Sequence, residues 1–200
     1  MMKHIVAILF FVLGTAGLLR AQDPSGEAAR AAILEFSARV SVIDCDFVQT
    51  KESSLLAEKA VSTGHMTYRK PGHLEWTYRT PSQISFVANG GNVTIRRDGR
   101  EETLAGNQNR MVREMTRMII SNIEGSVLAD GSMFKAEYEM VDGNLVATLY
   151  PQKKDLRKMW SKFVLYYDRE TKGARRFEMH EASGDLTVIT FSGIKYEFSE

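Results

Sequence analysis

The sequence predicts a mainly β protein with helices, in which one curled antiparallel sheet forms an incomplete β-barrel that helices cover. Short segments of alternating apolar and polar side chains recur along most of the chain, as expected for strands with one buried face. Turn-forming sequences separate these segments, such as Asp98-Gly99 and Asp142-Gly143. Two other segments repeat apolar residues with the spacing of a helix. Because a long antiparallel sheet usually curls, these observations together predict a barrel-like shape.

Residues 1–21 have the features of a cleavable signal peptide. Lys3 and His4 precede an apolar run over residues 5–13, which is too short for a membrane span. The small residue Ala21 marks the cleavage point. We therefore expect residues 22–200 to be exported and to form a single domain. A retained N-terminal anchor helix is the alternative.

Two helices are expected in the mature chain. Asp23-Pro24 starts the first, because proline suits the first helical position, and small apolar residues continue it to about Val40. The second covers residues 109–122, and Gly125 is placed to end it. Four residues of the second helix share one apolar face: Met111, Met115, Met118 and Ile119.

Strands are expected wherever the alternating pattern is bounded by turn residues. They cover residues 44–51, 62–69, 73–79, 83–88, 92–97, 133–140, 145–150, 162–167, 175–180, 186–191 and 194–198. The hairpin centred on Pro71-Gly72 should not bring His65 and His73 opposite each other.

One face of the predicted sheet carries bulky apolar side chains, so that face must be covered by its own core, by a helix or by a ligand. Its expected members are Phe47, Met66, Tyr68, Leu74, Trp76, Phe86, Ile95, Phe134, Tyr138, Leu149, Phe163, Leu165, Phe177, Met179, Val188 and Ile194. The methionine-bearing helix can plug this face as ordinary core, or its flexible side chains can line a cavity for a ligand. The candidate ligand-binding residues are Phe47, Leu74, Trp76, Phe86, Met111, Met115, Met118 and Ile119.

Charge and residue chemistry exclude several classes of function. Without the two basic residues of the signal peptide, the chain has 24 basic and 25 acidic residues, which argues against nonspecific nucleic-acid binding. Cys45, the only cysteine, is expected to be a small buried side chain. No histidine, serine or cysteine has the setting of a nucleophile, and no metal-ligand spacing or phosphate loop is present. We predict no catalysis, no metal and no cofactor.

The charged clusters are expected to be solvated. Asp44 and Asp46 belong to this group, as does Glu101-Glu102. Basic pairs at residues 153–154, 157–158 and 175–176 offer positive charge to an anionic partner, although a solvated face is the simpler interpretation.

A set of spaced motifs resembles a known family. These motifs are Phe47-x-Gln49, Gly64, Lys70-Pro71, Trp76, Pro81 and Asn89-Gly90. They resemble the periplasmic outer-membrane lipoprotein carriers of the LolA type, and the resemblance extends over about residues 28–196. It implies a monomeric periplasmic carrier that holds lipoprotein acyl chains in a hydrophobic cavity, without cofactor or chemistry. The implied partners are the acylated cargo, an inner-membrane lipoprotein-release transporter and an outer-membrane acceptor.

Two departures from the family pattern bear on function. The family has an arginine before the motif proline that is implicated in holding a helical lid shut, whereas this chain has Lys70 there and Arg69 one position earlier. The resemblance therefore assigns lid control to Arg69 and Lys70, although lysine lacks the planar donor fork of arginine. The chain also stops at Glu200, where the family runs into a further segment. Two alternatives follow: a carrier of another amphiphile, such as a glycolipid or lipid-linked pigment, or an envelope sensor or scaffold that binds a protein partner through a strand edge.

Overall fold

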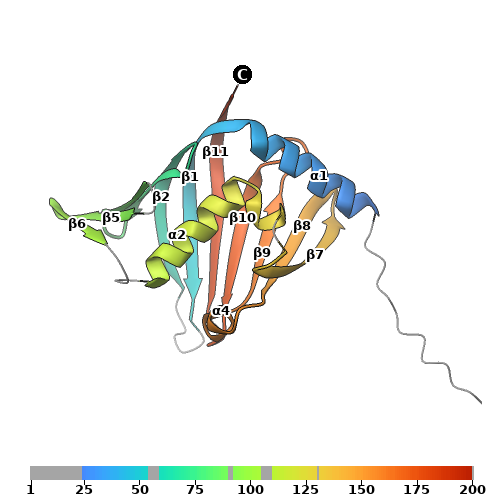
Figure 1. The fold of residues 1–200 in the computed structure, drawn as a ribbon. Coiled ribbons are helices and arrows are strands. Elements are labelled where there is room, and N and C mark those ends of the chain that lie inside the picture. The colour runs from blue at the N-terminus through green and yellow to red at the C-terminus, as the bar shows by residue number, and fades with distance from the viewer. Residues whose placement is uncertain (1–23, 54–58, 90–91, 105–109, 130, 200) are drawn as a thin grey trace, which may run out of the picture.

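The computed structural model describes residues 24–53, 59–89, 92–104, 110–129 and 131–199, with only the backbone described for residues 24 and 110–115. Within these residues, eleven strands form one open, curled antiparallel sheet. The strand order is β6-β5-β4-β3-β2-β1-β11-β10-β9-β8-β7, so the first and last strands of the chain, β1 and β11, lie side by side at its centre (Figure 1). The predicted fold class is confirmed.

The helices are α1 (Pro24–Arg39), α2 (Arg110–Ile123), α3 (Ser126–Ala129) and α4 (Lys154–Met159). The strands are β1 (Val40–Glu52), β2 (Ala60–Arg69), β3 (His73–Thr80), β4 (Ile84–Asn89), β5 (Asn92–Arg97), β6 (Arg100–Leu104), β7 (Phe134–Val141), β8 (Asn144–Pro151), β9 (Trp160–Tyr167), β10 (Ala174–Glu181) and β11 (Leu186–Phe198).

Two helices cover the concave side of the sheet. Figure 1 shows α2 lying across the middle strands and α1 lying over the β7–β8 end. Helix α1 packs against β7, β8 and α3, and its Ile33 is only 2% exposed. The Arg30 guanidinium holds α1 to α3 by donating two hydrogen bonds to the carbonyl oxygen of Leu128, at 3.0 and 2.8 Å. The apolar face of the sheet is therefore covered by helices.

Most predicted elements are found, and the differences have local causes. The predictions missed β6, α3 and α4 because these segments are short and largely charged or lack periodicity. The two strands predicted over residues 186–191 and 194–198 form one strand, β11. Gly193 lies at their junction with a positive φ of 60°, beside a register shift in the pairing of β11 with β1.

One predicted core residue, Val188, is on the wrong face. In β11 the buried neighbours are Thr187 and Ile189, which pair with Met179 and Phe177 of the core. Val188 pairs with Glu178 on the other side of the sheet. A frame error of one residue exchanges the two faces of a strand, and this is what happened here.

The Phe47–Gly64 motif has a structural explanation. The two residues are directly opposite in the β1–β2 pair, and the Phe47 ring occupies the space above Gly64 that a side chain would need. The same ring stacks on Trp76 of β3, with ring centroids 4.1 Å apart and planes at 28°. The glycine therefore allows an aromatic side chain to cross over its neighbouring strand and pack on the next one.

Candidate functional site

The concave face under α2 is the candidate site. A cavity of about 100 Å³ lies there, and four of the candidate ligand-binding residues line it together. Its lining consists of Leu74, Trp76, Phe86 and Ile119, with Gln49, Tyr78, Thr116 and Ile189. Phe47 lies directly behind this wall because it stacks on Trp76. The structure thus brings β3, β4 and α2 residues together as one apolar pocket.

The wall of this cavity is aromatic and carries one polar contact. Tyr78 meets Phe47 edge to face at 5.3 Å and Phe86 at 6.2 Å. Its hydroxyl donates a hydrogen bond of 2.8 Å to Oε1 of Gln49, and burial raises the pKa of Tyr78. The second motif residue, Gln49, therefore satisfies a tyrosine hydroxyl that points along an otherwise apolar surface.

A second cavity lies on the other flank of α2, again of about 100 Å³. Its lining consists of Arg117, Met118, Ser121, Ser126, Val127, Met133, Phe134 and Leu156. Met118 and Ile119 are adjacent in α2 but line different cavities, so the expected apolar stripe is divided between two spaces. The side chains of Met111 and Met115 lie outside the described residues.

Both cavities are small compared with the roughly 300–1,000 Å³ of typical ligand sites. In this conformation α2 itself occupies the space between them and contacts the sheet. A ligand that needs such a volume could therefore enter fully only if α2 moved away from the sheet.

The C-terminal end of α2 is attached to the sheet by two tyrosines. The Tyr68 hydroxyl donates a 2.6 Å hydrogen bond to Oε1 of Glu124, and burial raises the pKa of Tyr68. The Tyr167 hydroxyl donates a 2.9 Å hydrogen bond to Oδ1 of buried Asn122. Gly125 follows with a φ of 73° and ends the helix as predicted. Sequence reasoning missed this attachment, although two polar residues, Asn122 and Glu124, at the end of an amphipathic helix were a visible signal.

The predicted lid-control residues lie at the end of β2, and both are exposed. Lys70 donates hydrogen bonds from Nζ to the carbonyl oxygen of Ala38 and from its backbone N–H to Ser41, both at 2.8 Å. Lys70 therefore contacts the C-terminal turn of α1. Arg69 pairs with Val42 and His73 in the sheet ladder. Their role in holding the lid stays a prediction.

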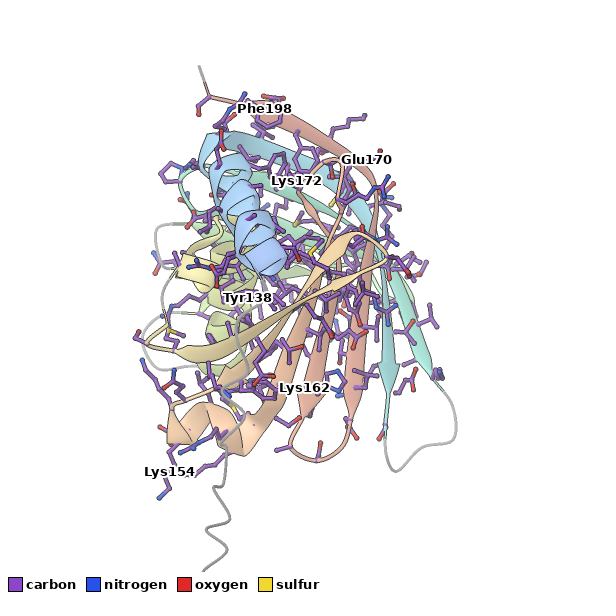
Figure 2. All side chains as sticks on the ribbon, turned by 90° about the vertical axis from the view of Figure 1, so that its right-hand side faces the viewer. Tyr138, Lys154, Lys162, Glu170, Lys172 and Phe198 are labelled. Atoms are coloured by element: carbon purple, nitrogen blue, oxygen red, sulfur yellow. The ribbon has the colours of Figure 1, made fainter. Side chains whose placement is uncertain are left out.

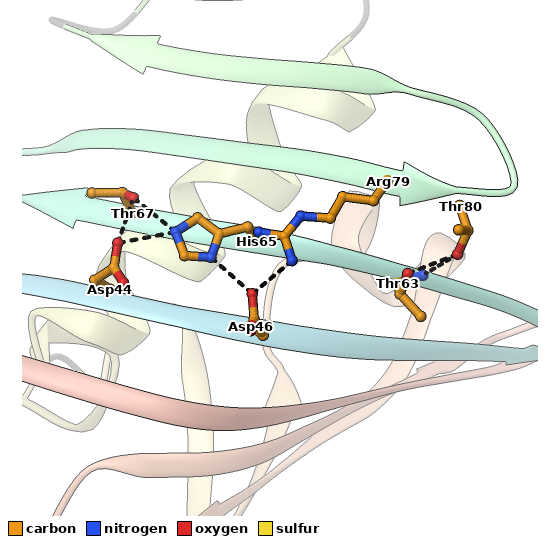
Figure 3. A network of polar contacts seen from close by, with 7 residues as sticks. All are labelled: Asp44, Asp46, Thr63, His65, Thr67, Arg79 and Thr80. Atoms are coloured by element: carbon orange, nitrogen blue, oxygen red, sulfur yellow. Dashed lines mark hydrogen bonds and ion pairs between the residues drawn. The ribbon is translucent and has the colours of Figure 1, made fainter.

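The opposite face of the sheet carries a charged network centred on His65 (Figure 3). Its Nδ1 lies 2.9 Å from Oδ1 of Asp46, and its Nε2 lies 2.9 Å from Oδ2 of Asp44. Thr67 also donates to Asp44, and Arg79 donates to Asp46 at 3.0 Å. The side chains of Asp44 and Asp46 are solvent-exposed, as expected for solvated carboxylates, at 41% and 55%. The sequence did not predict that strand pairing places a histidine between them.

This network should make stability depend on pH. Hydrogen bonds to Asp46 and Asp44 raise the pKa of His65 above 6.5, and the bond to His65 lowers the pKa of both aspartates below 3.8. The histidine contribution is complete below pH 6.5 and is lost as the pH rises through its raised pKa. The aspartate contribution is present above pH 3.8 and is lost as the pH falls through the lowered values.

We therefore expect His65→Gln to lower the melting temperature most at about pH 5 and progressively less toward about pH 9. Thermal melts of the native protein and the variant across this range test it. The control is His73→Gln, because among the described residues His73 has no ion pair. An equal effect of His65→Gln at both ends of the range would contradict a charged histidine in the network.

Other reactive groups in the described part of the chain have structural roles. Burial, followed by the charges of Asp44 and Asp46, raises the pKa of the Cys45 thiol to about 12, and the side chain is 2% exposed. Among the described residues, no three histidine, cysteine or acidic side chains are placed to hold a metal ion. None of the helices in the described ranges has the length and hydropathy that a membrane span requires.

Comparisons with known proteins identify the family. Residues 38–199 match the family "Outer membrane lipoprotein carrier protein LolA". A search of curated protein sequences gave no significant match.

Solved structures with a similar fold include the lipoprotein LppX of Mycobacterium tuberculosis, with 14% identity and a TM-score of 0.49 over 88% of this chain and 96% of that one. The MucA/MucB complex of Pseudomonas aeruginosa matches with 18% identity and a TM-score of 0.48, over 87% of this chain and 58% of that one. The LolA superfamily protein NE2245 of Nitrosomonas europaea matches with 11% identity and a TM-score of 0.45, over 86% and 94%. Because the family match covers most of its length, the chain belongs to the LolA family of outer membrane lipoprotein carrier proteins.

Proposed function

We propose that this protein is a periplasmic carrier that holds the acyl chains of a lipoprotein between the concave face of the sheet and α2. One observation carries the proposal: α2 covers an aromatic face and has an apolar cavity on each flank. Outward movement of this helix would join the two cavities into one groove. Membership of the LolA family supports the same function.

Helix α2 competes with the cargo for the concave face, and this competition limits the affinity for cargo. Each methylene group removed from water contributes about 0.8 kcal/mol to binding. The cargo must replace the contacts that Met118 and Ile119 make in the closed protein, which reduces the net affinity. This balance lets an acceptor withdraw the cargo. The proposed partners are an inner-membrane lipoprotein-release transporter that loads the carrier and an outer-membrane acceptor that unloads it, with residues 1–21 serving for export.

The proposal is tested by delipidating the purified protein and titrating it with a fluorescent acyl probe. We expect saturable binding at one site and quenching or shift of the emission of Trp76, which lines the cavity. Trp160 is 7% exposed and lies in β9, so a variant with Trp160→Phe isolates the Trp76 signal. A protein with native far-UV circular dichroism that binds no probe would refute the carrier function.

The identity of the cargo is tested separately. Native mass spectrometry of protein isolated from its own periplasm should show a bound lipoprotein or acylated fragment. A bound glycolipid or pigment would assign a different amphiphile to the same cavity. An empty protein in complex with another polypeptide would favour the sensor or scaffold alternative.

A further inference from the structure

Helix α4, between β8 and β9, forms a projection at one end of the molecule. Leu156 and Trp160 are each 7% exposed and anchor the segment in the core. The backbone of Ala182, in the β10–β11 turn, donates a 2.9 Å hydrogen bond to the carbonyl oxygen of Met159. Figure 1 shows α4 at the end of the sheet opposite the C-terminus. Its exposed side chains therefore project from a fixed base.

These exposed side chains are basic. Lys153, Lys154, Arg157 and Lys158 are all exposed, and we call them the basic surface. Asp155 is the single acidic residue between positions 153 and 162, and it lies 3.6 Å from Lys158. Within the described part of the chain, the other three cations have no ion pair. The mature chain is close to neutral overall, so this positive charge is a local concentration.

The two acidic residues at the neighbouring turn share one cation, so together they offset at most one positive charge of this surface. Glu181 and Asp185 flank the β10–β11 turn, and Nζ of Lys51 lies 3.3 Å from Glu181 and 3.9 Å from Asp185. Lys162, which is half-buried, lies in β9 three residues after the end of α4 and adds a further positive charge to this part of the chain.

The basic surface also borders an apolar cavity. Leu156 projects from the buried side of α4 and lines the second cavity together with Met118 and Phe134. A negatively charged surface bound by the four cations would therefore lie beside this flank of α2.

We propose that the basic surface docks the protein on membranes that contain anionic phospholipid. Four exposed cations on one projection suit a plane of phosphate headgroups, because each contributes additively near a negative surface and none requires a specific partner geometry. The attraction is screened within a Debye length, so it is reversible at moderate salt. The docking rests on these charges alone and does not depend on which cargo is carried.

The experiment is co-sedimentation of the purified protein with phosphatidylcholine vesicles that contain or lack phosphatidylglycerol. We expect binding only to the anionic vesicles and a loss of binding as salt is raised. The variant Lys153→Gln, Lys154→Gln, Arg157→Gln should partition roughly 10- to 100-fold more weakly. The charge-retaining variant Lys153→Arg, Lys154→Arg, Arg157→Lys should bind as the native protein does.

A matched control removes three exposed cations elsewhere: Arg100→Gln, Arg175→Gln and Lys195→Gln. Arg175 and Lys195 lie in β10 and β11, toward the end where Figure 2 shows Lys172 and Phe198, whereas Lys154 lies at the other end. This control should keep its binding to the anionic vesicles.

Equal losses of binding in both neutralised variants would show that only the net charge of the protein matters. Binding to both vesicle types would show that the apolar face, and not the basic surface, contacts the membrane. Either result, or no binding at all, would overturn the proposal. Acyl-probe binding that persists in the α4 variant separates docking from the carrier function.

Discussion

Replacing Gly64 with alanine is expected to destabilise the protein by about 3 kcal/mol or more, at the upper end of overpacking effects. A Cβ at this position would lie 2.3 Å from Cζ of Phe47 and 2.3 Å from the carbonyl oxygen of Thr77. The ring can move only by giving up its stacking on Trp76, and the carbonyl belongs to the backbone of the neighbouring strand. The clash therefore disrupts the junction of β1, β2 and β3.

Urea unfolding of Gly64→Ala measures this effect, with Gly131→Ala as the control. No atom lies within 4 Å of a Cβ built on Gly131, so its replacement should change stability by less than about 0.5 kcal/mol. If Gly64→Ala proved as stable as the control, the Phe47 ring would not lie over the glycine. Acyl-probe binding should weaken along with stability, because Trp76 loses the ring that supports it from behind.

The second large effect distinguishes cavity from core with two isoleucines. Ile33 in α1 is 2% exposed, so Ile33→Ala should destabilise the protein by roughly 2–5 kcal/mol and leave probe affinity unchanged. Ile119 in α2 lines a cavity that already contains empty space. Ile119→Ala should lower stability by under about 1.5 kcal/mol in the unliganded protein and should weaken probe binding instead.

Urea unfolding and probe titration of the same two variants decide the matter. A large destabilisation by Ile119→Ala with unaltered probe binding would show that α2 packs as an ordinary core helix and does not line a ligand site. The pair is well matched because the same atoms are removed from two helices of the same protein.

The sequence predicted the fold well where the signals are local. The alternation of Leu74 and Trp76 with polar residues placed β3 correctly, and its partners followed from the turn residues between strands. The charged strand β6 and the six-residue helix α4 lacked such periodicity and were missed. Val188 was predicted on the core face, where the structure has Ile189. Period-two alternation fails when the strand frame is wrong by one residue, and the bulge near Gly193 changes that frame within β11.

Four of the eight predicted ligand-binding residues line one cavity, and their role in binding stays a prediction. Leu74, Trp76, Phe86 and Ile119 do line one cavity, as expected for a face shared by strands and a helix. The ion pairs of His65 with Asp44 and Asp46 were not foreseen, because they join residues about 20 positions apart across a strand pair whose register only the folded sheet specifies.

The amino-acid sequence by itself determined which side chains form an apolar face and where most strands and helices lie, because periodicity and turn chemistry act over a few neighbouring residues. Only the tertiary structure decided how distant segments meet. It placed Met118 and Ile119 in different cavities and joined Tyr68 to Glu124. The rotation of α2 about its axis, and its position across the sheet, depend on the shapes of all the side chains packed beneath it, and no local pattern contains that information.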